Sequence, residues 1–133
     1  MLKKIFLLLI TGFAVIGLAN ADFNLDVDDD GKTEALTDGL LVIRYLFGFS
    51  DDALVAGATS INASRSSPAE IAAFLKNNES KLDIDNNGSV TALTDGLLVI
   101  RHLFGFSGGA LTSGAISENA DRGDAQEITA YFA

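Results

Sequence analysis

Positions 26–38 read Asp-Val-Asp-Asp-Asp-Gly-Lys-Thr-Glu-Ala-Leu-Thr-Asp, and this stretch decides how the rest of the chain is interpreted. Its first, third and fifth residues carry carboxylates, and its sixth residue is Gly31. Alternate residues of such a turn direct their oxygens to one side, toward a cation that takes roughly six to eight hard ligands. The glycine permits the sharp reversal that brings the backbone carbonyl of the seventh residue, Lys32, onto the ion. The stretch therefore predicts a Ca²⁺ loop, whereas Mg²⁺ fits less well because it requires tight octahedral geometry and retains waters.

The same pattern returns at positions 83–95, which read Asp-Ile-Asp-Asn-Asn-Gly-Ser-Val-Thr-Ala-Leu-Thr-Asp. A standard loop of this kind closes with Glu at position 12, but both loops here place Thr at that position and Asp at position 13. We expect each loop to be one residue longer and to close with that shorter acid, in the first turn of the following helix. The predicted ligands of the first ion are Asp26, Asp28, Asp30, Lys32 (carbonyl), Glu34 and Asp38; those of the second are Asp83, Asp85, Asn87, Ser89 (carbonyl), Thr91 and Asp95. Glu34 and Thr91 would bind directly or through water.

Two ions are therefore predicted, and the first loop should bind more tightly because it offers more carboxylates. The alternative is a pair of acidic surface turns that bind nothing. Two matches at the same offset disfavour that alternative, since several unneutralised carboxylates within one loop repel each other.

The two loops belong to two copies of one longer unit. Residues 25–75 align without a gap on residues 82–132, and 30 of the 51 aligned positions are identical. Such repeats are typical of a supersecondary unit that buries its apolar face against its copy. We expect residues 22–79 and residues 80–133 to form two calcium-loop–helix repeats, packed as one pseudo-symmetric domain.

Each loop leads into an apolar helix, so the predicted fold class is all-α. The helices are expected at residues 38–47 and 95–104, apolar on nearly all sides and therefore buried against each other. Each is predicted to start after an N-cap threonine and to stop at a glycine: Thr37 and Gly48, then Thr94 and Gly105.

A second helix is predicted in each repeat. Capping boxes at Ser67-Pro-Ala-Glu and Asp124-Ala-Gln-Glu each precede an amphipathic apolar pattern. A further short helical turn is expected within residues 51–56.

Residues 1–21 have the pattern of a secretory signal peptide. Lys3 and Lys4 precede an apolar run over residues 5–18, and the sequence Ala19-Asn-Ala offers a cleavage site. The run is shorter than the roughly 20 residues needed to span a bilayer. We therefore expect a secreted or periplasmic protein with no membrane attachment after cleavage near Ala21.

Composition excludes several other classes. The chain has 18 Asp and Glu against 9 Lys and Arg, a net charge of −9, which disfavours binding to nucleic acid phosphates. It has no cysteine, which excludes disulfides, thiol nucleophiles and a lipoprotein anchor. No nucleophile, acid–base pair or cofactor loop points to an enzyme.

An acidic, exported chain with two loop–helix repeats resembles the dockerin family. The resemblance covers residues 26–47 and 83–104. Dockerins are calcium-dependent two-repeat modules that attach secreted, often polysaccharide-degrading, proteins to cohesin domains. The resemblance implies a cohesin-like or other extracellular protein partner. Ordinary EF-hand pairs are the neighbouring resemblance, with residues 67–78 as the helix that enters the second loop.

Three further residues receive structural interpretations. Arg44 and Arg101 lie on apolar helices, where we expect a salt bridge to a nearby carboxylate, or a stem along the surface, rather than partner recognition. His102 replaces Tyr45 of the other repeat, so we expect it to pack rather than to catalyse.

A stand-alone calcium-stabilised protein without a partner remains the alternative to a dockerin-like module.

Overall fold

The fold is known from a computed structural model, which describes residues 24–133. The predicted signal peptide lies outside these residues. Within residues 24–133 all regular structure is helical and there is no strand, so the all-α prediction is confirmed. The elements are the π-helical turn η1 (Ala35–Gly39), α2 (Leu40–Leu46), α3 (Asp51–Val55), α4 (Pro68–Asn77), the 3₁₀ turn η2 (Glu79–Leu82), the π-helical turn η3 (Ala92–Gly96), α5 (Leu97–Leu103), α6 (Gly108–Thr112) and α7 (Ala125–Phe132). None of the helices in this part of the chain is long and apolar enough to cross a membrane.

The start of the first apolar helix differs from the prediction. Helical structure begins at Ala35, and Glu34 takes the N-cap position with an extended backbone, so the prediction of Thr37 as N-cap is wrong. The reason is that the side chain of Asp38 reaches back and accepts the Glu34 N–H at 2.8 Å. The second repeat shows the same difference: η3 begins at Ala92, and Thr94 lies inside it.

The predicted helix stop is confirmed. Gly48 has a φ of 92°, its N–H donates to the Tyr45 carbonyl, and the Phe49 N–H donates to the Arg44 carbonyl, both at 2.9 Å. This pair of bonds is a Schellman motif, which requires a left-handed residue and so favours glycine. Gly105 repeats the arrangement in the second repeat.

The second helices also begin as predicted. The Ser67 side chain accepts the Glu70 N–H, and the Glu70 side chain accepts the Ser67 N–H, which completes the capping box of α4. Asp124 and Glu127 form the same box at α7. The short helical turn expected within residues 51–56 is present as α3.

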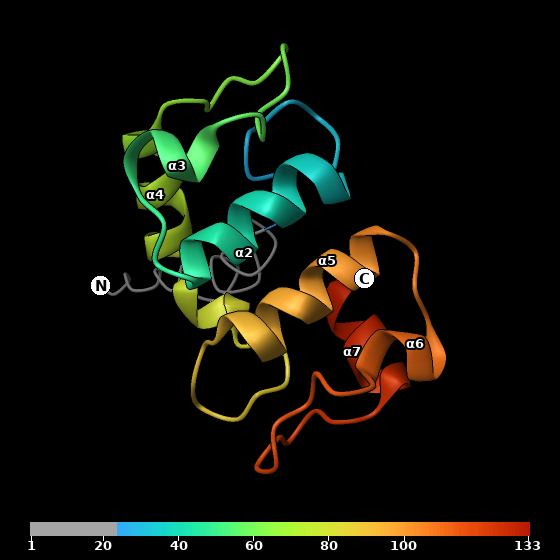
Figure 1. Cartoon of the computed structure of the whole chain (residues 1–133). Helices are drawn as coiled ribbons and strands as arrows, with labels where there is room; N and C mark the ends of the chain where they lie inside the picture. The colour runs from blue at the N-terminus through green and yellow to red at the C-terminus, as the bar shows by residue number, and fades with distance from the viewer. Residues whose placement is uncertain (1–23) are drawn as a thin grey trace, which may run out of the picture.

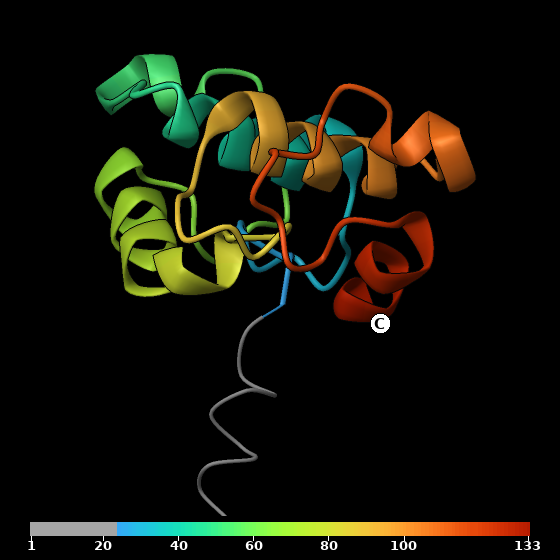
Figure 2. The same cartoon turned by 90° about the horizontal axis from the view of Figure 1, so that it is seen from below.

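Helices α2 and α5 lie side by side and run in opposite directions (Figure 1). A Cβ on Gly39 would lie 3.1 Å from Cγ1 of Ile100, and a Cβ on Gly96 would lie 2.9 Å from Cγ1 of Ile43. The two glycines therefore allow the helices to approach closely. Figure 2 shows α4 and α7 in a second layer beneath this pair. The largest fully buried side chains between the layers include Leu41, Leu54, Ile71, Leu75, Leu98, Leu111 and Ile128.

The two helix arginines bond backbone carbonyls rather than the carboxylates of a salt bridge. Nη1 of Arg44 donates to the carbonyls of Leu54 (3.1 Å) and Ala56 (2.8 Å), at the end of α3. Arg101 makes the equivalent bonds at the end of α6. Among the described residues the partners of both arginines are carbonyls, so the predicted salt bridge is wrong. The reason is that the last turn of each short helix leaves carbonyls without helical partners within reach.

The packing role expected for His102 is confirmed. Its ring stacks on Phe132 of α7, with centroids 4.2 Å apart and planes 11° from parallel. Burial lowers the pKa of the imidazole. His102 thus joins α5 to α7 as a neutral ring.

Candidate metal centres

Four predicted ligands of the first loop converge. Asp26, Asp28, Asp30 and Asp38 each offer a carboxylate oxygen, and these oxygens all lie within 4.8 Å of one another. The backbone permits this because Asp29 (φ 57°) and Gly31 (φ 89°) are left-handed. In the second loop Asp83, Asp85 and Asp95 converge in the same way. Each of these clusters can hold a metal ion.

Asp38 closes the first loop through the backbone. Its Oδ1 accepts the N–H groups of Val27 (2.7 Å) and Asp28 (3.2 Å), and its Oδ2 accepts the Glu34 N–H. Asp38 is fully buried, and burial raises the pKa of its carboxyl. The side chain thus joins the start of the loop to the start of the helix, and Asp95 makes the equivalent bonds in the second repeat.

Asp26 and Asp30 are oriented by amides of the same loop. The two oxygens of Asp26 accept the N–H groups of Asp30 (3.1 Å) and Gly31 (2.9 Å). Oδ1 of Asp30 accepts the Lys32 N–H at 2.9 Å, and this bond lowers the pKa of the Asp30 carboxyl. These bonds fix the orientation of both carboxylates within the loop.

Asp28 is buried, and only one of its two carboxylate oxygens is hydrogen-bonded within the described residues. It is 0% exposed, and its Oδ2 accepts the Ser60 N–H at 2.8 Å. Its Oδ1 is buried and has no hydrogen-bond partner among the described residues. The pKa of Asp28 is raised to about 6, chiefly by burial; the Ser60 bond lowers it, and the charges of neighbouring aspartates of the cluster contribute smaller increases.

Asp85 of the second repeat has the same environment as Asp28. Asp85 is 0% exposed, its Oδ2 accepts from the N–H (2.9 Å) and the hydroxyl of Ser117, and its Oδ1 has no partner in the described part of the chain. A buried carboxylate oxygen without a partner is costly, and a cation bound there removes the cost. The same unpartnered oxygen occurs at equivalent positions of both repeats, so it is a feature of the repeated unit and fits the binding of a cation.

Most of the remaining predicted ligands are exposed. Glu34 is exposed and lies outside the group of four converging carboxylates. The hydroxyl of Thr91 pairs with the hydroxyl of Thr94. Lys32 and Ser89 are exposed, and their amides donate to Asp30 and to Asn87. Asn87 therefore keeps the loop position of Asp30 with a neutral side chain.

Sequence reasoning missed Ser60 and Ser117, which contact the loops from 32 residues away. A signal was available, because Ser60 and Arg65 lie outside the loop and are identical to Ser117 and Arg122 at the same offset of 57.

Comparison of this chain with protein-family models, with curated proteins and with solved structures found no match. The site must therefore be interpreted from its own geometry.

Proposed function

We propose that this protein is an exported calcium-binding module. Each of its two loops would bind one Ca²⁺, and the ions would order a small helical domain for attachment to another protein. In this proposal the two loop–helix repeats pack as a dockerin-like or EF-hand-like pair. The observation that carries the proposal is the buried, unpartnered Oδ1 of Asp28 and of Asp85, each inside a cluster of carboxylates.

The chemistry of the donors supports calcium in particular. The converging atoms are all carboxylate oxygens, and the sequence adds a carbonyl after the left-handed glycine of each loop. Oxygen-rich, flexible loops of this kind suit Ca²⁺, whereas sulfur and imidazole donors would favour zinc. Outside the cell, calcium is abundant enough to fill even sites with a Kd of about 10⁻⁴ M. The ions would then act as permanent structural ties rather than as a signal.

The two loops should differ in affinity. The first cluster contains four carboxylates and the second contains three, with Asn87 in place of Asp30. Because ligand charge tunes calcium affinity, the first loop is expected to bind more tightly.

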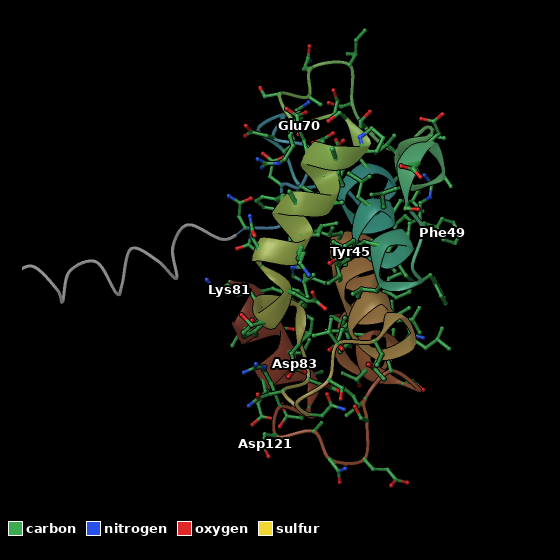
Figure 3. All side chains as sticks on the ribbon, turned by 90° about the vertical axis from the view of Figure 1, so that its left-hand side faces the viewer. Tyr45, Phe49, Glu70, Lys81, Asp83 and Asp121 are labelled. Carbon is green, nitrogen blue, oxygen red and sulfur yellow. The ribbon has the colours of Figure 1, made fainter. Side chains whose placement is uncertain are left out.

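Exposed apolar side chains favour a protein partner over a lone protein. Six large ones form three equivalent pairs around the ends of α2 and α5: Leu36 and Leu93, Phe47 and Phe104, Phe49 and Phe106. Phe47 is 54% exposed and Phe104 is 52% exposed. Leu36 of the first repeat and Phe104 of the second line one shallow surface hollow, so side chains from both repeats meet there. Phe49, labelled in Figure 3, lies at the outer edge of the molecule. Such side chains gather at surfaces that bind other proteins.

The partner would be a cohesin-like or other extracellular protein, and the link to polysaccharide breakdown rests on the resemblance alone. The second candidate is a stand-alone calcium-stabilised protein of the periplasm or cell surface. It is favoured by the burial of Asp28 and Asp85, because ions bound by these carboxylates would stabilise each repeat without any partner. An enzyme is a distant third candidate.

A melting experiment with a chelator tests the calcium proposal. We expect EGTA to lower the melting temperature sharply and added Ca²⁺ to restore it, because ligand that binds only the folded state stabilises it. Added Mg²⁺ at the same concentration is the control and should restore much less. An unchanged melting curve with EGTA would rule out calcium ties. Capture of a secreted protein with Ca²⁺, lost with EGTA and lost in a Phe47→Ser, Phe104→Ser variant, would separate the partner module from the lone protein.

A further inference from the structure

A second segment of each repeat lies against its metal loop. We name residues 60–65 and residues 117–122 the clasp segments. Figure 1 shows each of these segments, green at residues 60–65 and orange-red at residues 117–122, beside the loop of its own repeat. In Figure 3, Asp83 of the second loop and Asp121 of its clasp lie toward the same end of the molecule.

The clasp contacts the loop at consecutive residues. Besides the bond from Ser60 to the Asp28 carboxylate, the Ser64 N–H donates to the Asp29 carbonyl (3.1 Å) and the Arg65 N–H donates to the Asp28 carbonyl (3.0 Å). Nε of Arg65 donates to the Val27 carbonyl at 2.8 Å. All of these bonds have equivalents in the second repeat, made by Ser117, Asp121 and Arg122.

The clasp also contacts the second helix. The guanidinium of Arg65 lies 3.9 Å from the ring centroid of Phe74 on α4, and that of Arg122 lies 4.0 Å from the ring of Tyr131 on α7. Each arginine therefore bonds the metal loop with one side of its group and stacks on the second helix with its face. A continuous set of contacts thus runs from the loop carboxylates to α4 and to α7.

We infer that Arg65 and Arg122 are positioning residues for the two ion sites, and that each clasp couples ion binding to the docking of the second helix. This inference rests on the proposed calcium binding. Coupling of this kind is reciprocal: an ion that fixes the loop stabilises the docked clasp, and loss of the clasp weakens the ion. Residues that orient metal ligands typically change metal affinity by about 10-fold or more when replaced.

The sign of the effect separates this role from simple electrostatics. A cation beside an anionic loop repels Ca²⁺, so its removal would raise calcium affinity if charge alone mattered. The clasp predicts the opposite, because without Arg65 the loop carbonyl of Val27 loses its donor and the loop loses its fixed shape.

The test is a calorimetric Ca²⁺ titration of the full chain and of the variants Arg65→Gln and Arg122→Gln. We expect each variant to weaken the site of its own repeat by about 10-fold and to leave the other site unchanged, so each variant is the control for the other. Raised or unchanged affinity, or equal weakening of both sites, would overturn the clasp. A wild-type chain that takes up no Ca²⁺ would instead refute the proposed function itself.

Hydrogen exchange on the wild-type chain decides the question if a variant does not fold. With one equivalent of Ca²⁺, the amides of Ser64 and Arg65 should be slowed while those of Asp121 and Arg122 are not, or the reverse if the second loop fills first. Equal slowing of both clasps, or slowing of neither, at half loading would contradict the inference.

Discussion

Replacement of Asp28 by Asn should stabilise the metal-free protein and abolish the response of the first site to calcium. The carboxylate of Asp28 is fully buried, has one oxygen without a partner and lies within 4.8 Å of three other carboxylates. In the metal-free protein at pH 7 this buried charge destabilises the fold, and a bound cation would offset that cost. An amide removes the charge, keeps the shape and can still accept from Ser60.

The structure sets the size of the effect. A pKa raised from 3.8 to about 6 corresponds to about 3 kcal/mol of lost folding free energy when the group is ionised at pH 7. The new amide must donate to the neighbouring carboxylates, and imperfect bonds there would reduce the gain by about 1–2 kcal/mol. A net gain of about 1–2 kcal/mol would raise the melting temperature by several degrees for a domain of this size.

The assay is thermal unfolding followed by circular dichroism at pH 7, with EGTA and with saturating Ca²⁺. Asp29→Asn is the matched control: it removes the same charge from the same loop, but Asp29 is exposed and its left-handed backbone suits Asn. The control should shift the metal-free melting temperature little and keep two calcium sites. If Asp28→Asn melts below the wild type in EGTA and still binds two ions, the proposed role of Asp28 in the first site is wrong.

Three further predictions concern pH, packing and helix ends. The raised pKa of Asp28 gives stability that is complete below pH 3.8 and is lost as pH rises through about 6, so melting with and without Ca²⁺ should diverge increasingly between pH 4 and pH 7. Gly96→Ala should cost about 1–2 kcal/mol in urea unfolding, because overpacking against Ile43 at 2.9 Å outweighs the helix propensity of Ala, and Gly39→Ala, at 3.1 Å from its neighbour, should cost less. Arg44→Ala should cost about 1–3 kcal/mol in the same assay, because two carbonyls at the end of α3 lose their donor.

Each of these predictions has an internal check. A constant calcium-induced shift from pH 4 to pH 7 would contradict the pH argument. Gly109→Ala, on a helix with open space around the new methyl, should stabilise rather than destabilise, so equal losses at Gly96 and Gly109 would refute the packing argument. Arg44→Lys should recover only part of the loss in Arg44→Ala, and full recovery would show that charge rather than the two bonds matters.

Local signals in the sequence predicted the ends of helices where a single residue type decides the geometry. Gly48 could be placed because a left-handed stop needs glycine, and the box at Ser67 could be placed because its two partners are three residues apart. The N-cap role predicted for Thr37 is wrong because the side chain of Asp38, inside the first turn, accepts the N–H at the helix start. A linear pattern does not distinguish these two acceptors. The partners of Arg44 could not be predicted because the carbonyls of Leu54 and Ala56 become its neighbours only when α3 folds back onto α2.

The same limit applies to the candidate site. The spacing of Asp26, Asp28 and Asp30 follows from the turn itself, so local reasoning brought these carboxylates together. The contribution of Ser60 depends on tertiary structure that returns the chain to the loop after α3. Comparison of the two repeats gives a partial signal, because Ser60 recurs as Ser117.

The close approach of α2 and α5 has a consequence for the assembly of the two repeats. Gly39 faces Ile100, and the equivalent Gly96 faces the equivalent Ile43, so each repeat makes the same glycine–isoleucine contact with the other. This reciprocity is the signature of an isologous interface, the kind that two identical subunits form across a twofold axis. Covalent linkage through residues 76–81 turns such an association into an intramolecular one, governed by effective concentration. The fold of this chain therefore does not depend on how dilute it becomes, whereas two separate copies of one repeat would dissociate as they are diluted.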